Sequence, residues 1–156
     1  MGSRLKLKDL AYIAGFLDGD GSLMIQVKKR SDSKKGIRIM LTICFYQDTR
    51  HEEPLLWIRS VLKVGYFSRR KDGISELRIN GFKTVERVLI QLLPFIKFKN
   101  KQAKMLLKSA HILQSKMGND QKKQLVENIL AVQSENYVAK RKKTKSELFQ
   151  LLGLTP

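Results

Sequence analysis

The sequence predicts an α+β fold in which two pairs of antiparallel strands form one sheet that helices cover on one face. Two patterns support this prediction. Apolar and polar residues alternate in paired short segments, as in half-buried strands, and apolar residues at helical spacing precede, separate and follow these pairs. The 156 residues contain no internal linker, so we expect residues 1–156 to form one domain with a substantial core. The expected order is αββαββα, followed by further C-terminal helices.

The first helix is predicted from about residue 7 to residue 20. Its apolar residues lie at helical spacing: Leu10, Ile13, Ala14 and Leu17. Gly19 and Gly21 are expected to end it, because glycine adopts the backbone conformations found at helix ends. Asp18 and Asp20 then lie at the C-terminus, where the helix dipole disfavours a carboxylate by roughly 0.3–1 kcal/mol. This unfavourable negative cluster indicates that a cation binds there.

One stripe of the same helix carries residues that favour contact with a second helix. Gly15 and Gly19 are four residues apart, on one face with Tyr12 and Phe16. Bare glycine backbone lets another helix approach closely. We therefore expect this face to form an interface, with a carboxylate at its end.

The first pair of strands follows directly. Leu23, Ile25 and Val27 alternate with polar residues, and a second alternation runs over residues 37–46, with a turn at 31–36. Pro54 opens a helix that we expect to end at Leu62.

The second half of the chain repeats the order of strand, strand and helix. Strands are expected at 65–70 and 74–80, joined by a turn at 71–73. Helices are expected at 82–93, 99–116, 120–134 and 146–152, the last preceded by a basic loop that begins at residue 140. Thr144 and Glu147 have the spacing of a capping box.

Composition limits the partners of the chain. Lys and Arg number 31 against 14 Asp and Glu, a formal charge of +17, which favours a polyanion. No segment approaches the roughly 20 apolar residues of a membrane span, and the N-terminus lacks the apolar core of a signal peptide. Cys44 is the single cysteine, which excludes an intrachain disulfide. We expect a soluble intracellular protein without a small-molecule substrate.

The outer face of the predicted sheet is the expected reading surface for double-stranded DNA. An antiparallel ribbon fits the major groove, where Arg recognises guanine, Gln recognises adenine, and Met, Thr or Cys contact thymine methyl groups. The basic loop is expected to contact phosphates, which position a protein without reading sequence. The predicted DNA contacts are Ser22, Gln26, Lys28, Arg30, Arg38, Met40, Cys44, Tyr66, Ser68, Arg70, Glu76, Arg78, Lys140, Arg141 and Lys143.

Residues 13–21, which read IAGFLDGDG, resemble the LAGLIDADG motif of homing endonucleases and of their intron-maturase relatives. The resemblance continues into Ser22 and Leu23 and extends to the segment LPFIKFK at 93–99, so it covers most of the chain. The family core has the element order predicted above. The chain is most similar to the single-motif branch, whose members are homodimers, because it holds one copy of the motif.

The resemblance implies a site-specific endonuclease that cuts both strands of a long, near-palindromic DNA target with Mg²⁺, for which Mn²⁺ substitutes. Such proteins are encoded in introns of organelles, bacteria and archaea, so the host compartment stays open. An alternative is a maturase or a non-cleaving DNA- or RNA-binding protein of the same fold, and the same positive charge supports it. A third possibility, a basic structural protein, does not require the Asp-Gly-Asp-Gly helix end.

By the same resemblance, the essential acid of the family falls on Asp20, and the helix-end carbonyl that coordinates metal falls on Gly19. Two Asp20 carboxylates close together in a dimer need compensation of their charge, and oxygen ligands favour Mg²⁺. Asp18 points about 200° around the helix from Asp20. We therefore interpret Asp18 as a capping or supporting residue.

Further active-site positions also follow from the resemblance. Gln47 falls where the family carries a Gln near the attacking water, and Lys99 falls on the active-site lysine, with Lys97 as a competing assignment. Relatives carry an arginine where this chain has Arg50 and His51. The sequence leaves open which of these two residues takes the role of that arginine.

Overall fold

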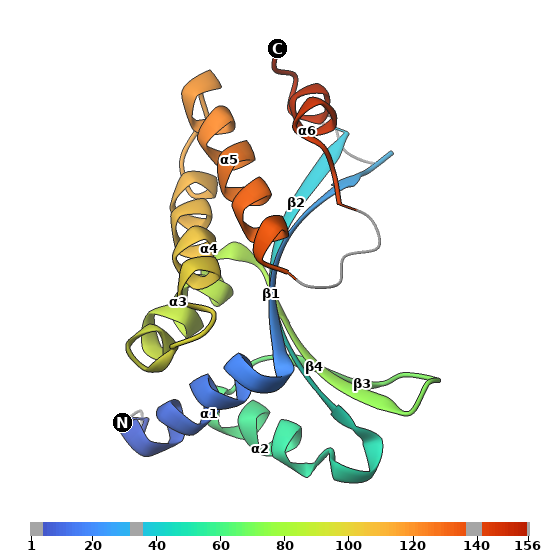
Figure 1. Cartoon of the computed structure of the whole chain (residues 1–156), viewed down its shortest axis with the longest axis vertical. Helices are drawn as coiled ribbons and strands as arrows, with labels where there is room; N and C mark the ends of the chain where they lie inside the picture. The colour runs from blue at the N-terminus through green and yellow to red at the C-terminus, as the bar shows by residue number, and fades with distance from the viewer. Residues whose placement is uncertain (1–4, 32–35, 137–141, 156) are drawn as a thin grey trace.

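The computed structural model describes residues 5–31, 36–136 and 142–155, and it confirms the predicted α+β fold (Figure 1). One antiparallel sheet contains β1 (Gly21–Lys29), β2 (Ile37–Asp48), β3 (Tyr66–Arg69) and β4 (Ile74–Asn80). The strand order is β1-β2-β4-β3, so the two predicted hairpins lie side by side with β2 and β4 paired at the centre. β1 lies at one edge of the sheet.

The helices begin and end within a few residues of their predicted positions. They are α1 (Leu7–Asp20), α2 (Glu53–Leu62), α3 (Phe82–Leu92), α4 (Asn100–Leu113), α5 (Asn119–Glu135) and α6 (Lys145–Leu151). Short 3-10 turns follow β2 and α3, at Thr49–His51 and Leu93–Phe95. Thr144 caps α6 as expected, since its side chain accepts a hydrogen bond from the Glu147 N–H.

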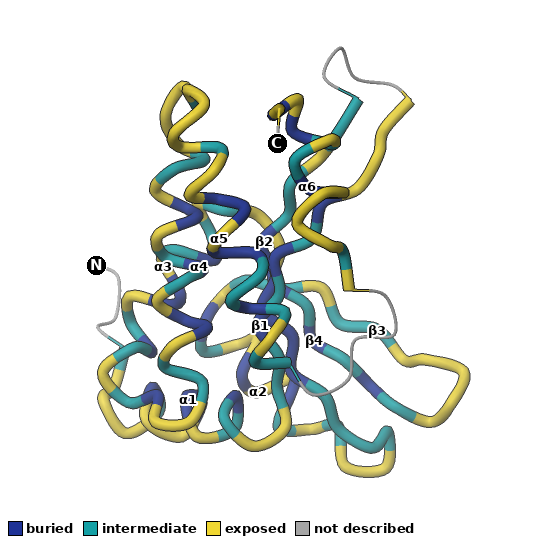
Figure 2. The backbone as a smooth tube through the Cα atoms, turned by 45° about the horizontal axis from the view of Figure 1, so that its top comes forward, coloured by how far each residue is buried: buried dark blue, intermediate teal, exposed yellow. Residues whose placement is uncertain are grey.

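The core lies between one face of the sheet and helices α1 to α5 (Figures 1 and 2). The four predicted apolar residues of α1 are all buried, and they share one core cluster with the alternating apolar residues of β1, β2 and β4. The opposite face of the sheet is left free by these five helices. The packing therefore presents the polar face of the strands, as the alternation predicted.

The end of α1 differs in detail from the prediction. Gly19 lies within the helix, and Gly21 begins β1 in an extended conformation, with φ of −129°. A side chain at position 21 would collide with Leu17, because its Cβ would lie 2.6 Å from Leu17 Cδ1 and 2.8 Å from Leu17 O. Gly21 is required here by close packing rather than by a conformation that only glycine adopts.

Trp57 lies at the edge of the core. Its side chain on α2 is 38% exposed and packs edge-on against Tyr12, with ring centroids 5.4 Å apart. Within the described residues, no helix combines the length and apolar character needed to cross a membrane.

Candidate active site and nucleic-acid interface

The last turn of α1 places the predicted metal ligands at the surface. Asp20 is the final residue of the helix, and both Asp20 and Gly19 are exposed. The last carbonyl groups of a helix have no partner within it, so they remain available to a cation. Within the described ranges, no three His, Cys, Asp or Glu side chains group closely enough to hold a metal ion.

Asp18 faces a different part of the chain from Asp20. Its Oδ2 accepts hydrogen bonds from the main-chain N–H groups of Lys97 (2.8 Å) and Phe98 (3.1 Å), and its Oδ1 accepts one from Lys99 (2.9 Å). Burial raises the pKa of Asp18, but these three donors and the Lys99 charge outweigh burial and leave the pKa below its ordinary value. The predicted capping or supporting role fits these contacts.

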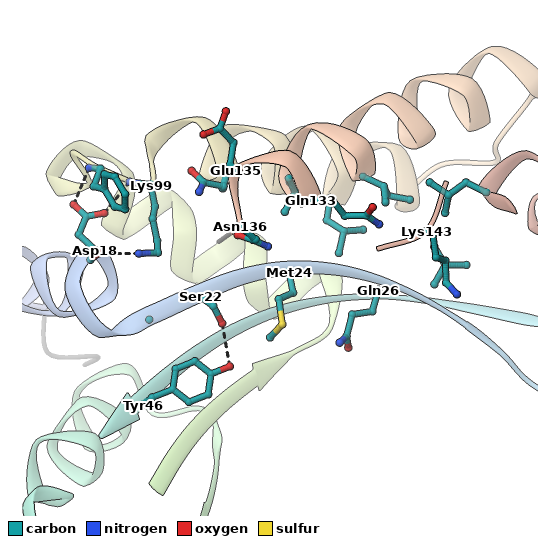
Figure 3. A pocket seen from close by; sticks show the side chains of 18 of the residues that line it. Asp18, Ser22, Met24, Gln26, Tyr46, Lys99, Gln133, Glu135, Asn136 and Lys143 are labelled. Atoms are coloured by element: carbon teal, nitrogen blue, oxygen red, sulfur yellow. Dashed lines mark hydrogen bonds between the residues drawn. The ribbon is translucent and has the colours of Figure 1, made fainter. Parts of the chain in front are cut away.

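Lys99 is the predicted catalytic residue that the fold brings to the end of α1 (Figure 3). Its Nζ donates a 2.7 Å hydrogen bond to the carbonyl oxygen of Asp18. Burial lowers the pKa of Lys99, while the nearby carboxylates of Asp18 and Asp20 act in the opposite direction. Lys97, the competing assignment, is exposed and contacts Asp18 through its main-chain N–H.

Gln47, Arg50 and His51 lie together where β2 ends and the following turn begins. The Oε1 of Gln47 accepts a hydrogen bond from the N–H of Asp48 at 2.9 Å. Arg50 pairs with both carboxylate oxygens of Asp48, at 3.0 and 2.9 Å, and is 82% exposed. Among the described residues, no hydrogen bond joins Gln47 to Asp18 or Lys99.

The predicted DNA contacts of the four strands share one face of the sheet. In β1 and β2, Ser22 pairs with Cys44, Gln26 with Met40, and Lys28 with Arg38. In β3 and β4, Tyr66 pairs with Arg78 and Ser68 with Glu76, on the same face. Arg30 and Arg70 flank the strands and are exposed, and Arg70 pairs with Asp72 in the turn at 2.6 Å.

Cys44 is the exception among the predicted contacts, because burial keeps its side chain from the surface of this face. Its side chain is fully buried at the centre of the sheet, between Ser22 and Arg78 in the strand register. Larger neighbours cover it, since Tyr46 lies beside it and its hydroxyl is 3.1 Å from the Ser22 hydroxyl. Burial raises the pKa of Cys44 to about 11 and that of Tyr46 to about 12.

The described residues include only the end of the basic loop. Lys140 and Arg141 lie outside the described residues, whereas Lys143 lies at one end of a groove of 770 Å³ that begins at Asp18 and Lys99 (Figure 3). The groove runs between β1 and the C-terminal half of α5. The Nδ2 of Asn136 joins the end of α5 to β1 by donating a 3.2 Å hydrogen bond to the Leu23 carbonyl.

Sequence reasoning missed the groove residues on α4 and α5. Gln102, which is only 5% exposed, lines the groove with Gln133 and Asn136. Single Asn or Gln residues in or beside an amphipathic helix do not indicate a groove in the sequence. They line one here only because tertiary packing brings the helices next to β1.

A second missed cluster braces the β3–β4 hairpin. Glu52 accepts hydrogen bonds from Arg69 Nε (3.0 Å) and Nη2 (2.6 Å), and from the buried Ser75 hydroxyl at 2.6 Å. Ser75 Oγ also lies 3.0 Å from Thr49 Oγ1. These contacts fix the second hairpin against the turn that carries Arg50.

The predicted interface face of α1 is uncovered in the single chain. Tyr12, Gly15 and Gly19 are exposed, Phe16 is partly exposed, and a Cβ at Gly15 or Gly19 would meet nothing within 4 Å. The Tyr12–Trp57 pair extends this face onto α2.

Comparison with known proteins gives consistent results. Residues 13–104 match the LAGLIDADG endonuclease family. The DNA endonuclease I-CvuI of Chlorella vulgaris is 33% identical over 97 residues, which cover 62% of this chain and 60% of that protein. The DNA endonuclease I-CreI of Chlamydomonas reinhardtii is 34% identical over 108 residues, covering 69% and 66% respectively. The aligned parts thus span less than two thirds of these relatives' lengths.

The structural similarity extends over nearly the whole chain. A crystal structure of I-CvuI in complex with its target, in the presence of Ca, aligns with a TM-score of 0.81 and 26% identity. That alignment covers 96% of this chain and 98% of that one. The motif-bearing helix, the sheet and the sequence match agree, and the chain belongs to the LAGLIDADG endonuclease family.

Proposed function

We propose that the chain is a site-specific homing endonuclease that cuts double-stranded DNA as a homodimer with Mg²⁺, or with Mn²⁺ in its place. The observation that carries this proposal is that an exposed acid and an amine both lie at the end of α1, beside a basic sheet face. Asp20 is exposed there, and the Lys99 amine donates a 2.7 Å hydrogen bond to the Asp18 carbonyl in the same turn. An acid and an amine in this arrangement suit phosphodiester cleavage.

The donors at the end of α1 fit Mg²⁺, because carboxylate and carbonyl oxygens are the hard ligands that this ion prefers. Asp20 and the Gly19 carbonyl would hold it, and a second chain would supply the remaining protein ligands. Bound Mg²⁺ supplies Lewis-acid stabilisation of the phosphate. Lys99 would neutralise charge on the same phosphate, Gln47 would orient a water, and Arg50 or His51 would take the place of the arginine of relatives.

Two exposed surfaces of the chain suit the two partners. The uncovered glycine face of α1, with Tyr12 and Phe16, fits a second copy, because two such helices can pack closely. The polar face of the sheet, excluding Cys44, fits the major groove, and Lys143 with the rest of the basic loop fits the phosphate backbone.

The test is cleavage of a randomised DNA library with Mg²⁺, compared between the wild type and Asp20→Asn. We expect the wild type to cut a narrow set of sites, and Asp20→Asn to bind the same DNA without cutting it. The amide keeps the size of the side chain but removes its charge, so folding should be unaffected. Binding of RNA or DNA without any cleavage by the wild type would favour the maturase or non-cleaving alternative.

A further inference from the structure

Asp18 joins the end of α1 to a segment that is 79 to 81 residues away in sequence. Both of its carboxylate oxygens are engaged, since three consecutive N–H groups at 97–99 donate to them. In addition, the Nζ of Lys99 donates a hydrogen bond to the main-chain carbonyl of Asp18. The two residues therefore hold each other through main-chain and side-chain groups at once.

The segment 97–99 presents its main-chain N–H groups to Asp18, and its Lys99 carbonyl accepts a 3.0 Å hydrogen bond from the Ala103 N–H of α4. It lies between the 3-10 turn at Leu93–Phe95 and the start of α4 at Asn100, and Lys97 and Phe98 are exposed. Ile96 anchors the chain just before it, with 4% of its surface exposed. Successive N–H groups of this kind form a concavity that attracts an anion, and the adjacent helix N-terminus adds to that attraction. Asp18 provides the anion.

We infer that Asp18 is a positioning residue, which sets the Lys99 amine beside Asp20 before DNA arrives. This inference rests on the proposed endonuclease function. Without the Asp18 carboxylate, the three N–H groups of the segment 97–99 would lose their acceptor. The Lys99 side chain would then be held only by its bond to the main-chain carbonyl of residue 18. Both carboxylate oxygens of Asp18 accept hydrogen bonds from this segment, and Asp18 lies about 200° around α1 from Asp20.

A double-mutant cycle tests this role in the full-length protein, with single-turnover cleavage of a wild-type target in Mg²⁺. Asp18→Asn should lower the cleavage rate by about 10- to 100-fold, as expected when a supporting contact to a catalytic group is lost. DNA affinity and the dimer should stay unchanged. In a Lys99→Met background, the same Asp18→Asn change should cost less than about twofold, because effects of coupled residues are not additive.

Two controls separate positioning from general loss of structure. Asp120→Asn removes the same charge from the first turn of α5, and we expect no change in rate. Amide hydrogen exchange of the wild type should show protection of the N–H groups of 97–99, and Asp18→Asn should remove that protection locally. If Asp18→Asn fails to fold, Asp18→Glu, which retains the charge, replaces it in the same cycle.

The inference is overturned if Asp18→Asn cleaves at the wild-type rate, or if its full effect persists in the Lys99→Met background. Rapid exchange of the 97–99 amides in the wild type would also overturn it. Failure of the wild type to cut any DNA would instead refute the proposed function, and the exchange result would still report on the contact between Asp18 and this segment.

Discussion

Residues on the polar face of the sheet differ in how far neighbouring side chains cover them. Alternation along β2 correctly placed Cys44 on the polar face, together with Arg38 and Met40. Alternation does not report the size of adjacent side chains, and Cys44 is small enough to be covered by Tyr46 and Arg78. A residue at the centre of a four-stranded sheet can therefore be buried on both faces, which sequence spacing cannot reveal.

The environment of Cys44 predicts an inert thiol. With a pKa raised to about 11, it carries almost no thiolate at about pH 8, where an exposed cysteine is partly ionised. We expect an aromatic disulfide reagent to leave the native protein unlabelled and to label one thiol rapidly in denaturant. Rapid labelling of the native protein would mean that Cys44 is accessible and would return it to the set of candidate DNA contacts.

The candidate active site was predictable only in part. The motif sequence located Asp20 and Gly19, and the family spacing located Lys99, because these assignments depend on local sequence. The contact of Asp18 was not predictable, since its three donors are main-chain N–H groups of a segment about 80 residues later, and main-chain groups leave no signal in the sequence. The same limit explains why Glu52 and Arg69 were missed as a pair.

At the scale of elements, the exposed glycine face of α1 predicts opposite effects on the monomer and on assembly. Gly15→Leu places a side chain in open space, and replacing glycine within a helix should stabilise the single chain by up to about 1 kcal/mol. The same leucine should separate two α1 helices that pack through this face.

Sedimentation and thermal unfolding together check this prediction. We expect Gly15→Leu to sediment as a monomer at concentrations where the wild type is a dimer, with no loss of secondary structure. Lys104→Leu, which adds the same side chain at an exposed position of α4, should remain a dimer. A wild type that cuts DNA while sedimenting as a monomer would contradict the dimer proposal.

The brace between α2 and the β3–β4 hairpin predicts a pH-dependent contribution to stability. Hydrogen bonds from Arg69 and then Ser75 hold the pKa of Glu52 below its ordinary value of 4.5. Because the folded-state pKa is lowered, the contribution of Glu52 is present above its unfolded-state pKa and is lost as the pH falls through the folded-state value.

We therefore expect Glu52→Gln to lower the Tm at neutral pH, and this difference from the wild type to shrink as the solution is acidified below the ordinary pKa of a glutamate. Glu53→Gln, one residue along in the first turn of α2, serves as the matched control, because it removes the same charge without touching Arg69 or Ser75 and should lower the Tm at neutral pH by less. A difference for Glu52→Gln that did not change with pH would show that the brace does not depend on charge.

At the scale of the whole molecule, the charge of +17 should make the proposed binding of DNA sensitive to salt. Individual basic residues should contribute to affinity and to base preference in different ways. Lys143 lies in the basic loop beside the groove, whereas Arg38 lies on the strand face. Lys143→Ala should weaken binding to all sequences alike and flatten the plot of log affinity against log salt by about one unit. Arg38→Ala should cost roughly 1–3 kcal/mol on the preferred site and relax preference at one or two base pairs.

Titrations in an Asp20→Asn background, which suppresses cutting, would measure both effects on matched and scrambled DNA. If Lys143→Ala altered base preference and Arg38→Ala did not, the sheet face would not be the reading surface.

The outermost position of β1 has a consequence for the protein without DNA. An unpaired strand edge can template the edge of another copy and so start aggregation. Here the end of that edge carries three consecutive positive charges, on Lys28, Lys29 and Arg30. Further along the edge, the Leu23 carbonyl already accepts a hydrogen bond from Asn136. The charges that favour nucleic acid thus also keep like edges apart. Neutralising them with a short polyanion that is too small to fill the sheet face should make the free protein precipitate through this strand.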